Sequence, residues 1–148
     1  MPEKQTVRRA RRDKRQGKAP STQAGEFVRE EMEHVRGGKH GARSTKQAIA
    51  IGLSKARRAG VKLRPPKRGA ASAKTRKSAQ SAYRRGQSGS RKTSRTRSRA
   101  TRRALRREGR RAASRSALSR QARTSSRRRS ASSRSAAARK AVRTRKRK

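Results

Sequence analysis

Residues 21–60 read STQAGEFVREEMEHVRGGKHGARSTKQAIAIGLSKARRAG, and this stretch holds the clearest structural signals in the chain. Thr22 is a suitable helix N-cap, and the pair Gly37 and Gly38 is a typical stop signal. Between these signals, apolar residues recur at helical spacing on one face, namely Ala24, Phe27, Val28, Met32 and Val35. The pattern therefore predicts an amphipathic helix whose opposite face carries Glu26, Glu30 and Glu33.

A second helix is predicted after the polar loop that follows Gly38. Ser44 and Gln47 have the spacing of a capping box, and Gly60 is a natural left-handed stop. Small and apolar residues share one broad face of this helix, namely Ala48, Ile49, Gly52, Leu53, Ala56 and Ala59. We therefore expect an all-α, antiparallel two-helix hairpin over residues 21–64, which is marginally stable and is assisted by homodimerisation or by a nucleic acid.

Composition excludes several classes of protein. The chain has 148 residues with 50 Lys or Arg against 7 Asp or Glu, which gives a formal net charge of +43. One Phe, one Tyr and no Trp leave too few large side chains for the core of an ordinary globular enzyme of this length. No apolar run approaches the roughly 18 residues of a membrane-spanning helix. Without cysteine, disulfides and thiolate metal sites are excluded.

The positive charge is concentrated in the second half of the chain. Residues 1–66 hold 18 basic and 6 acidic residues, whereas residues 67–148 hold 32 basic residues and only Glu108. Because the second part has few large apolar side chains, we expect a long disordered tail that becomes helical on binding. The predicted organisation is a basic N-terminal arm over 1–20, the helical hairpin over 21–64 and the basic tail over 65–148.

Such a polycation is typical of a protein that neutralises nucleic-acid phosphates without reading sequence. Because aromatic residues for stacking on single-stranded bases are scarce, duplex DNA is the preferred partner, bound and bridged in a histone-like manner. For the basic residues of the hairpin, the alternative to nucleic-acid binding is a charged, solvent-exposed face with internal Glu–Arg pairs. The candidate nucleic-acid-binding residues are Lys46, Lys55, Arg57, Arg58, Lys62, Arg64, Arg95, Arg97, Arg99, Arg102, Arg103, Arg106, Arg107, Arg110, Arg111, Arg127, Arg128 and Arg129.

Two other functions fit the same composition. The first is an RNA-binding or ribosome-associated protein, because composition does not separate RNA from DNA. The second is an interaction protein that is regulated by phosphorylation of Arg–Ser pairs such as Arg97 with Ser98.

The sequence offers no catalytic constellation. His34 and His40 are the only histidines, and we interpret both as surface residues rather than as metal ligands or catalytic groups. The glycines near Lys39 lack the spacing of a phosphate-binding loop. We therefore expect a protein that is not an enzyme and that has no cofactor and no metal.

The segment STKQAIAIGLSKARRAG, residues 44–60, resembles a family of small, basic, uncharacterised bacterial proteins, and the resemblance covers about residues 20–64. It implies a bacterial source and no established activity. The region after Pro66 is similar in composition to the tails of linker histones and bacterial histone-like proteins, although it is richer in Arg and poorer in Pro. With no targeting signal visible, the expected location is the bacterial cytoplasm, at the nucleoid.

Overall fold

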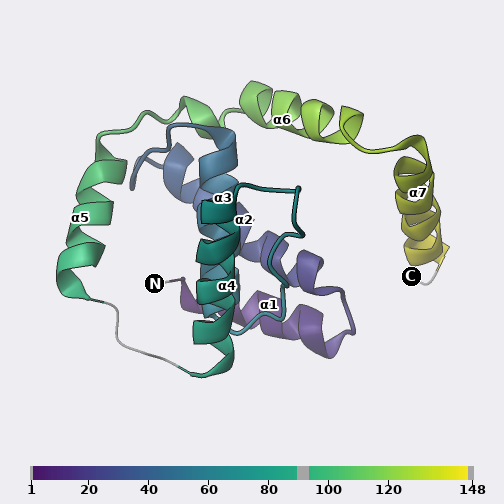
Figure 1. The fold of residues 1–148 in the computed structure, drawn as a ribbon, viewed down its shortest axis with the longest axis horizontal. Helices are drawn as coiled ribbons and strands as arrows, with labels where there is room; N and C mark the ends of the chain where they lie inside the picture. The colour runs from purple at the N-terminus through teal and green to yellow at the C-terminus, as the bar shows by residue number, and fades with distance from the viewer. Residues whose placement is uncertain (1, 90–93, 147–148) are drawn as a thin grey trace. The chain divides into compact units, whose positions relative to one another are not determined.

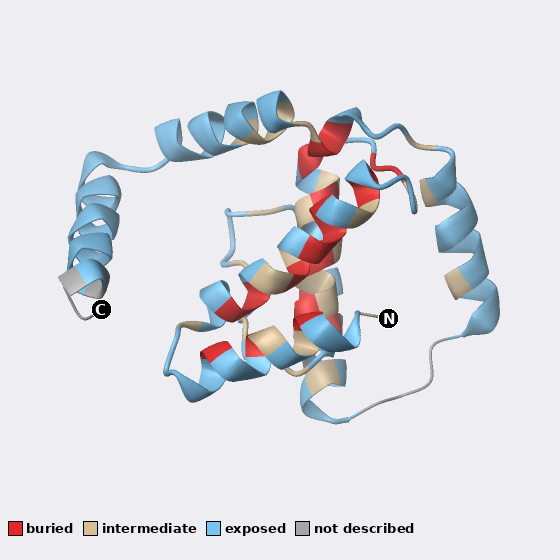
Figure 2. Ribbon diagram, turned by 180° about the vertical axis from the view of Figure 1, so that it is seen from behind, coloured by how far each residue is buried: buried red, intermediate tan, exposed pale blue. Residues whose placement is uncertain are grey.

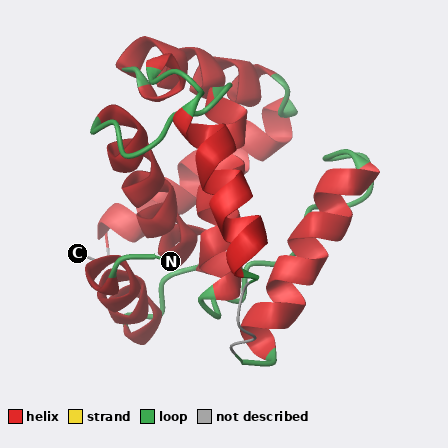
Figure 3. Cartoon of the chain, turned by 90° about the vertical axis from the view of Figure 1, so that its left-hand side faces the viewer, coloured by secondary structure: helices red, strands yellow, loops and turns green. Residues whose placement is uncertain are grey.

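The computed structural model describes residues 2–89 and 94–146, and this part of the chain is helical with connecting loops and no strand (Figures 1 and 3). Its elements are α1 (Lys4–Arg15), α2 (Pro20–Arg36), α3 (Thr45–Arg58), α4 (Ala73–Gln87), α5 (Arg95–Arg106), the 3-10 turn η1 (Arg111–Ala113), α6 (Arg115–Arg127) and α7 (Ala131–Lys146). The described residues up to Ser114 form one compact unit, and those from Arg115 onward form another. The predicted all-α class is confirmed.

Helices α2 and α3 pack against each other and form the centre of the first unit. The apolar face predicted for α2 is buried there, with Phe27 fully inaccessible to solvent. Gly52 of α3 lets the two backbones approach closely, since a Cβ atom at this position would lie 2.7 Å from the Cα atom of Val28. The predicted cap at Ser44 is present, because its hydroxyl accepts a hydrogen bond from the backbone amide of Gln47, whose side-chain oxygen accepts from the backbone amide of Arg43 rather than of Ser44.

Local signals set the ends of these helices. Gly38 and Gly60 have φ of +74° and +89°, so both adopt the left-handed conformation that ends a helix. The predicted cap at Thr22 is wrong, because α2 begins earlier, with Ala19 as N-cap and Pro20 in the first turn. Proline fits this position, since its missing amide hydrogen would have no helical partner there.

The two-helix hairpin is wrong, because α1 and α4 extend the packing on either side. Helix α1 packs on α2 and buries Thr6, Ala10 and Asp13. Helix α4 packs on α3 through Ala79 and Ala82, although it follows Pro65 and Pro66, which the sequence suggested as the end of the folded module. These interfaces use small side chains, so they need few of the large apolar residues that the prediction counted.

The segment after α5 also belongs to the first unit. The amides of Gly41 and Ala42, in the loop between α2 and α3, donate hydrogen bonds to the carbonyl oxygens of Leu105 and Gly109. The Thr45 hydroxyl donates to the Ala112 carbonyl oxygen at 2.7 Å. The loop is thereby fixed between helices far apart in sequence.

The long disordered tail is also wrong, because residues 73–89 and 94–146 are mostly helical. Helices α5, α6 and α7 are solvent-exposed almost throughout (Figure 2), so burial does not account for them. Alanine and arginine are among the strongest helix formers, and the Ser130 hydroxyl caps α7 by accepting from the Ser133 amide. The prediction weighed buried surface and gave too little weight to this local propensity.

A candidate nucleic-acid interface and a histidine–glutamate cluster

Helix α1 presents a row of arginines on its exposed face. Their spacing of i, i+3, i+4 and i+7 places them on one side of the helix, and all are exposed, namely Arg8, Arg11, Arg12 and Arg15. The opposite face is buried against α2, and an ion pair of 2.9 Å joins Arg9 Nε to Glu26 Oε2 across that interface. The sequence interpretation missed this row because it treated residues 1–20 as an arm rather than as a helix with two faces.

Helix α5 carries a second row of arginines, and its members belong to the predicted binding residues. Helical spacing aligns Arg95, Arg99, Arg102 and Arg106 over about 16 Å, and all four are exposed. Arg97 and Arg103 are exposed as well but lie off this line. We call Arg95, Arg99, Arg102 and Arg106 the α5 arginine row. The helix therefore places four positive charges in a line on one exposed face.

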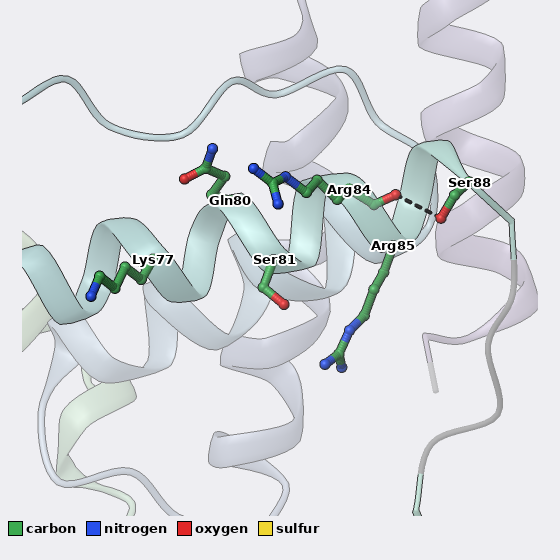
Figure 4. A pocket seen from close by; sticks show the side chains of 6 residues that line it. All are labelled: Lys77, Gln80, Ser81, Arg84, Arg85 and Ser88. Atoms are coloured by element: carbon green, nitrogen blue, oxygen red, sulfur yellow. Dashed lines mark hydrogen bonds between the residues drawn. The ribbon is translucent and has the colours of Figure 1, made fainter.

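The outer face of α4 forms a basic hollow of about 460 Å³. Figure 4 shows the Arg84 side chain lying beside Gln80 and the Arg85 side chain leaving the helix in another direction. The pKa of Arg58, on α3, is lowered by desolvation and then by the positive charge of Arg85. An anion bound near Arg58 and Arg85 would relieve this repulsion. The hollow is lined by Lys77, Gln80, Ser81, Arg84, Arg85 and Ser88.

The basic residues predicted on α3 and its exit divide into two groups. Two are engaged by the protein itself: Arg57 is buried, with its Nε donating to the Leu63 carbonyl oxygen, and Lys55 forms ion pairs with Glu30 and Glu31. These two side chains are therefore not presented to a polyanion, and the Lys55 pairs agree with the alternative of internal pairing. The exposed group is Lys46, Arg58, Lys62 and Arg64.

The remaining predicted residues are exposed on both units. In the first unit Arg107 and Arg110 lie between α5 and η1, and Arg111 begins η1. In the second unit Arg127 is the last residue of α6, and Arg128 and Arg129 follow it. Residues 115–148 contain no acidic residue, so the second unit has no carboxylate side chain of its own to neutralise its arginines.

Both histidines gather with three carboxylates beside the C-terminal half of α2. The surface interpretation of His34 and His40 is wrong, because each side chain is only 13% exposed. Glu30 is also buried rather than on an outer face, as is its neighbour Glu31. Glu31, His34 and His40 can each offer one metal-ligating atom, with these atoms within 4.8 Å of one another. We call these three residues the Glu–His cluster.

Charged contacts hold this cluster from several sides. Lys55 Nζ lies 2.6 Å from Glu31 Oε2 and 3.3 Å from Glu30 Oε1. Glu3 Oε1 accepts a hydrogen bond from Lys39 and contacts His34, and these two partners, Lys39 first, lower the pKa of Glu3 to about 2. Through Glu3 and Lys55, the cluster thus joins the C-terminal half of α2 to the N-cap of α1 and the last turn of α3.

Within residues 2–89 and 94–146, none of the helices is long and apolar enough to cross a bilayer. No curated protein and no solved structure matched the chain significantly. Nothing in these comparisons supports the compositional likeness to histone-type tails. A protein family matches a longer stretch of the chain that contains residues 44–60, the segment that carries the resemblance. The match starts earlier than expected, so it includes α1 to α3 with the Glu–His cluster. Residues 3–68 match a family of unknown function, DUF6496.

Proposed function

We propose that the protein binds nucleic acid through its phosphates, without sequence preference, and that its main partner is duplex DNA. The observation that carries this proposal is the α5 arginine row, with its four side chains exposed on one helix face. Only one acidic residue, Glu108, follows residue 66, so carboxylates of the chain compensate few of the arginines beyond it. A guanidinium is always charged and its planar fork matches two phosphate oxygens.

Dimensions support a backbone contact rather than base readout. Duplex DNA carries about one charge per 1.7 Å, so the roughly 16 Å of the α5 arginine row faces on the order of ten phosphates. The four arginines of the row are therefore outnumbered by the phosphates along this length of duplex, so each can contact at least one. Asn and Gln read adenine and Asp and Glu read cytosine, and α5 carries none of these four residue types, so its base contacts would be limited chiefly to guanine contacts by Arg.

Two separate basic units also support the bridging of two duplexes in a nucleoid. The first unit carries the arginines of α1 and α5, and the second carries α6 and α7 with no acidic residue. If each unit engages its own duplex, equimolar protein will capture free duplex on beads that carry a tethered duplex.

The salt dependence of binding tests the proposal. Binding of the full chain to a labelled duplex and to a structured RNA of equal length is measured by fluorescence anisotropy over a salt series. The slope of log K against log salt is negative, and each phosphate contact contributes about −0.9 to it. Replacing the α5 arginine row with Gln should therefore make the slope less steep by about 3 to 4. Replacing the same four residues with Lys is the matched control and should leave the slope unchanged.

Two outcomes contradict parts of this proposal. No binding to either nucleic acid at moderate salt would refute phosphate neutralisation as the function. Tighter binding to the structured RNA than to duplex DNA at equal salt would support the RNA-binding or ribosome-associated alternative instead.

A further inference from the structure

We propose that Glu31, His34 and His40 bind a zinc ion. Glu31 and His34 are three residues apart on α2 and therefore share a face, and the loop after α2 brings His40 to the same place. Two imidazoles and one carboxylate, with a fourth position left for water, form a common ligand set for Zn²⁺. The imidazoles favour zinc over Mg²⁺ or Ca²⁺, which prefer oxygen ligands.

The distances already approach those of a tetrahedral site. Zinc bonds of about 2.0 to 2.2 Å place neighbouring ligand atoms roughly 3.3 Å apart. His40 Nε2 and Glu31 Oε1 are separated by 3.2 Å, so one edge of the tetrahedron is present. The three ligand atoms lie within 4.8 Å of one another, so shifts of about 1.5 Å or less, within the reach of side-chain rotation, bring the remaining pairs to the same spacing.

Hydrogen bonds on the outer nitrogens of both rings prepare the other nitrogens as ligands. His40 Nδ1 lies 3.1 Å from the Gly41 carbonyl oxygen, which only accepts, so this nitrogen carries the proton. In the neutral ring Nε2 then presents a lone pair to the Glu31 carboxylate. Two lone pairs facing each other at 3.2 Å need either a proton on Nε2 or a cation between them, and zinc would supply the cation.

His34 is oriented in a similar way. Its Nε2 lies 2.9 Å from Glu3 Oε1, so the N–H of this nitrogen donates a hydrogen bond to the carboxylate. In the neutral ring Nδ1 is then free of a proton and lies 4.0 Å from Glu30 Oε1. A histidine that ligates a metal almost always donates its other ring hydrogen to a carboxylate or a carbonyl oxygen, which are the two acceptors found here.

Lys55 is compatible with this site because it occupies the other oxygen of Glu31. Its Nζ lies 2.6 Å from Oε2, which leaves Oε1 toward His40. With neutral histidines, the carboxylates of Glu3, Glu30 and Glu31 exceed the ammonium groups of Lys39 and Lys55 by one charge. In a chain of net charge +43, this is a local excess of negative charge around two imidazoles.

Zinc at this place would fasten the loop between α2 and α3. His40 precedes Gly41, whose amide donates a hydrogen bond of 2.8 Å to the Leu105 carbonyl oxygen. The ion would thus connect α2 to the end of α5 through two consecutive loop residues, His40 and Gly41. We therefore expect zinc to raise the melting temperature of the full chain.

The test uses the full chain, freed of nucleic acid and treated with a chelator, and Zn²⁺ alone as the probe. Isothermal titration should give one zinc per chain, and Co²⁺ should produce the visible absorption of tetrahedral coordination. His34→Gln and His40→Gln should each weaken zinc binding at least about tenfold. Glu33→Gln is the matched control, because this exposed carboxylate lies on the same helix outside the cluster, and its affinity should equal that of the wild type.

Because the chain has only two histidines and no cysteine, the double His variant removes every imidazole and thiol ligand. Zinc binding that persists unchanged in that variant would overturn the proposal. If a variant fails to fold, the wild type still decides by nuclear magnetic resonance. One equivalent of zinc should shift the ring nitrogens of both histidines, whereas rings that carry two protons at neutral pH and do not respond to zinc would refute the site.

Discussion

Two glycines in the central helices offer a matched test of how closely α2 and α3 pack. Gly25 is exposed in α2, and a Cβ atom built there meets nothing within 4 Å. Gly52 is buried in α3, and its Cβ atom would lie 2.7 Å from the Val28 Cα and 3.0 Å from the Phe27 carbonyl oxygen. The same substitution, Gly→Ala, therefore has opposite consequences at the two positions.

The size of each effect follows from helix propensity and packing. Alanine is favoured over glycine inside a helix by about 1 kcal/mol, so Gly25→Ala should raise the free energy of unfolding by roughly 0.5–1 kcal/mol. Gly52→Ala has the same gain, but carbon atoms normally approach only to about 3.5–4.0 Å. Since backbone atoms cannot rotate away, the helices must separate, at a cost of about 2–3 kcal/mol. The net result is a loss of about 1–2 kcal/mol.

Urea unfolding followed by far-ultraviolet circular dichroism measures both variants against the wild type. The two midpoints should move in opposite directions, with a gap of about 2–3 kcal/mol between the free energies of unfolding. Hydrogen exchange of the α2 and α3 amides separates this transition from the exposed helices α5 to α7. If Gly52→Ala proves as stable as Gly25→Ala, the close approach of α2 and α3 is incorrect.

Two further predictions concern α4 and the start of α1. Gly86→Ala should lower the free energy of unfolding by about 1–3 kcal/mol, since its Cβ atom would overlap the Arg57 carbonyl oxygen, and unchanged exchange protection of the α4 amides would contradict this packing. Because Glu3 has its pKa lowered to about 2, its contribution is complete above the ordinary value near 4.5 and is lost as the pH falls toward 2. Urea titrations should thus show Glu3→Gln less stable than the wild type at pH 6 and nearly as stable at pH 2, and a difference at pH 2 as large as that at pH 6 would contradict the assignment.

The sequence predicted those parts of the fold that depend on local patterns. The apolar face around Phe27 and Val35, the cap at Ser44 and the stop at Gly60 are each visible within one helix length, and the structure has all of them. Each of these signals acts between residues a few positions apart. A single sequence reports such relations directly.

Helices α1 and α4, which the sequence interpretation missed, pack through small residues. Helix α1 buries Ala10 and helix α4 buries Ala79 and Ala82, while Gly86 allows close contact with α3. Counting large apolar side chains undervalues such interfaces, because their contact area comes partly from backbone atoms brought close together. Which alanine meets which glycine depends on the tertiary arrangement, and composition does not reveal it.

The sequence contains a weak local signal for the Glu–His cluster. Glu31 and His34 have the i, i+3 spacing of paired ligands on a helix, and the only other histidine follows six residues later. Nothing in the sequence indicated that the loop would return His40 to the same face. That return depends on Gly41, where a side chain would overlap the backbone at Glu108 in a segment more than sixty residues away.

The distribution of charge explains how so basic a chain folds and still retains a cationic surface. Of the 7 acidic residues, six make ion-pair contacts within residues 1–114, including Asp13 with Lys18, Glu26 with Arg9 and Glu108 with Arg43. The two most deeply buried carboxylates, Glu30 and Glu31, lie where helices meet, so they offset repulsion at the points where the backbone must come together. The arginines on the outer faces of α1 and α5 are left largely uncompensated. The same few acidic side chains that make compaction feasible therefore leave most of the positive charge available to a polyanion.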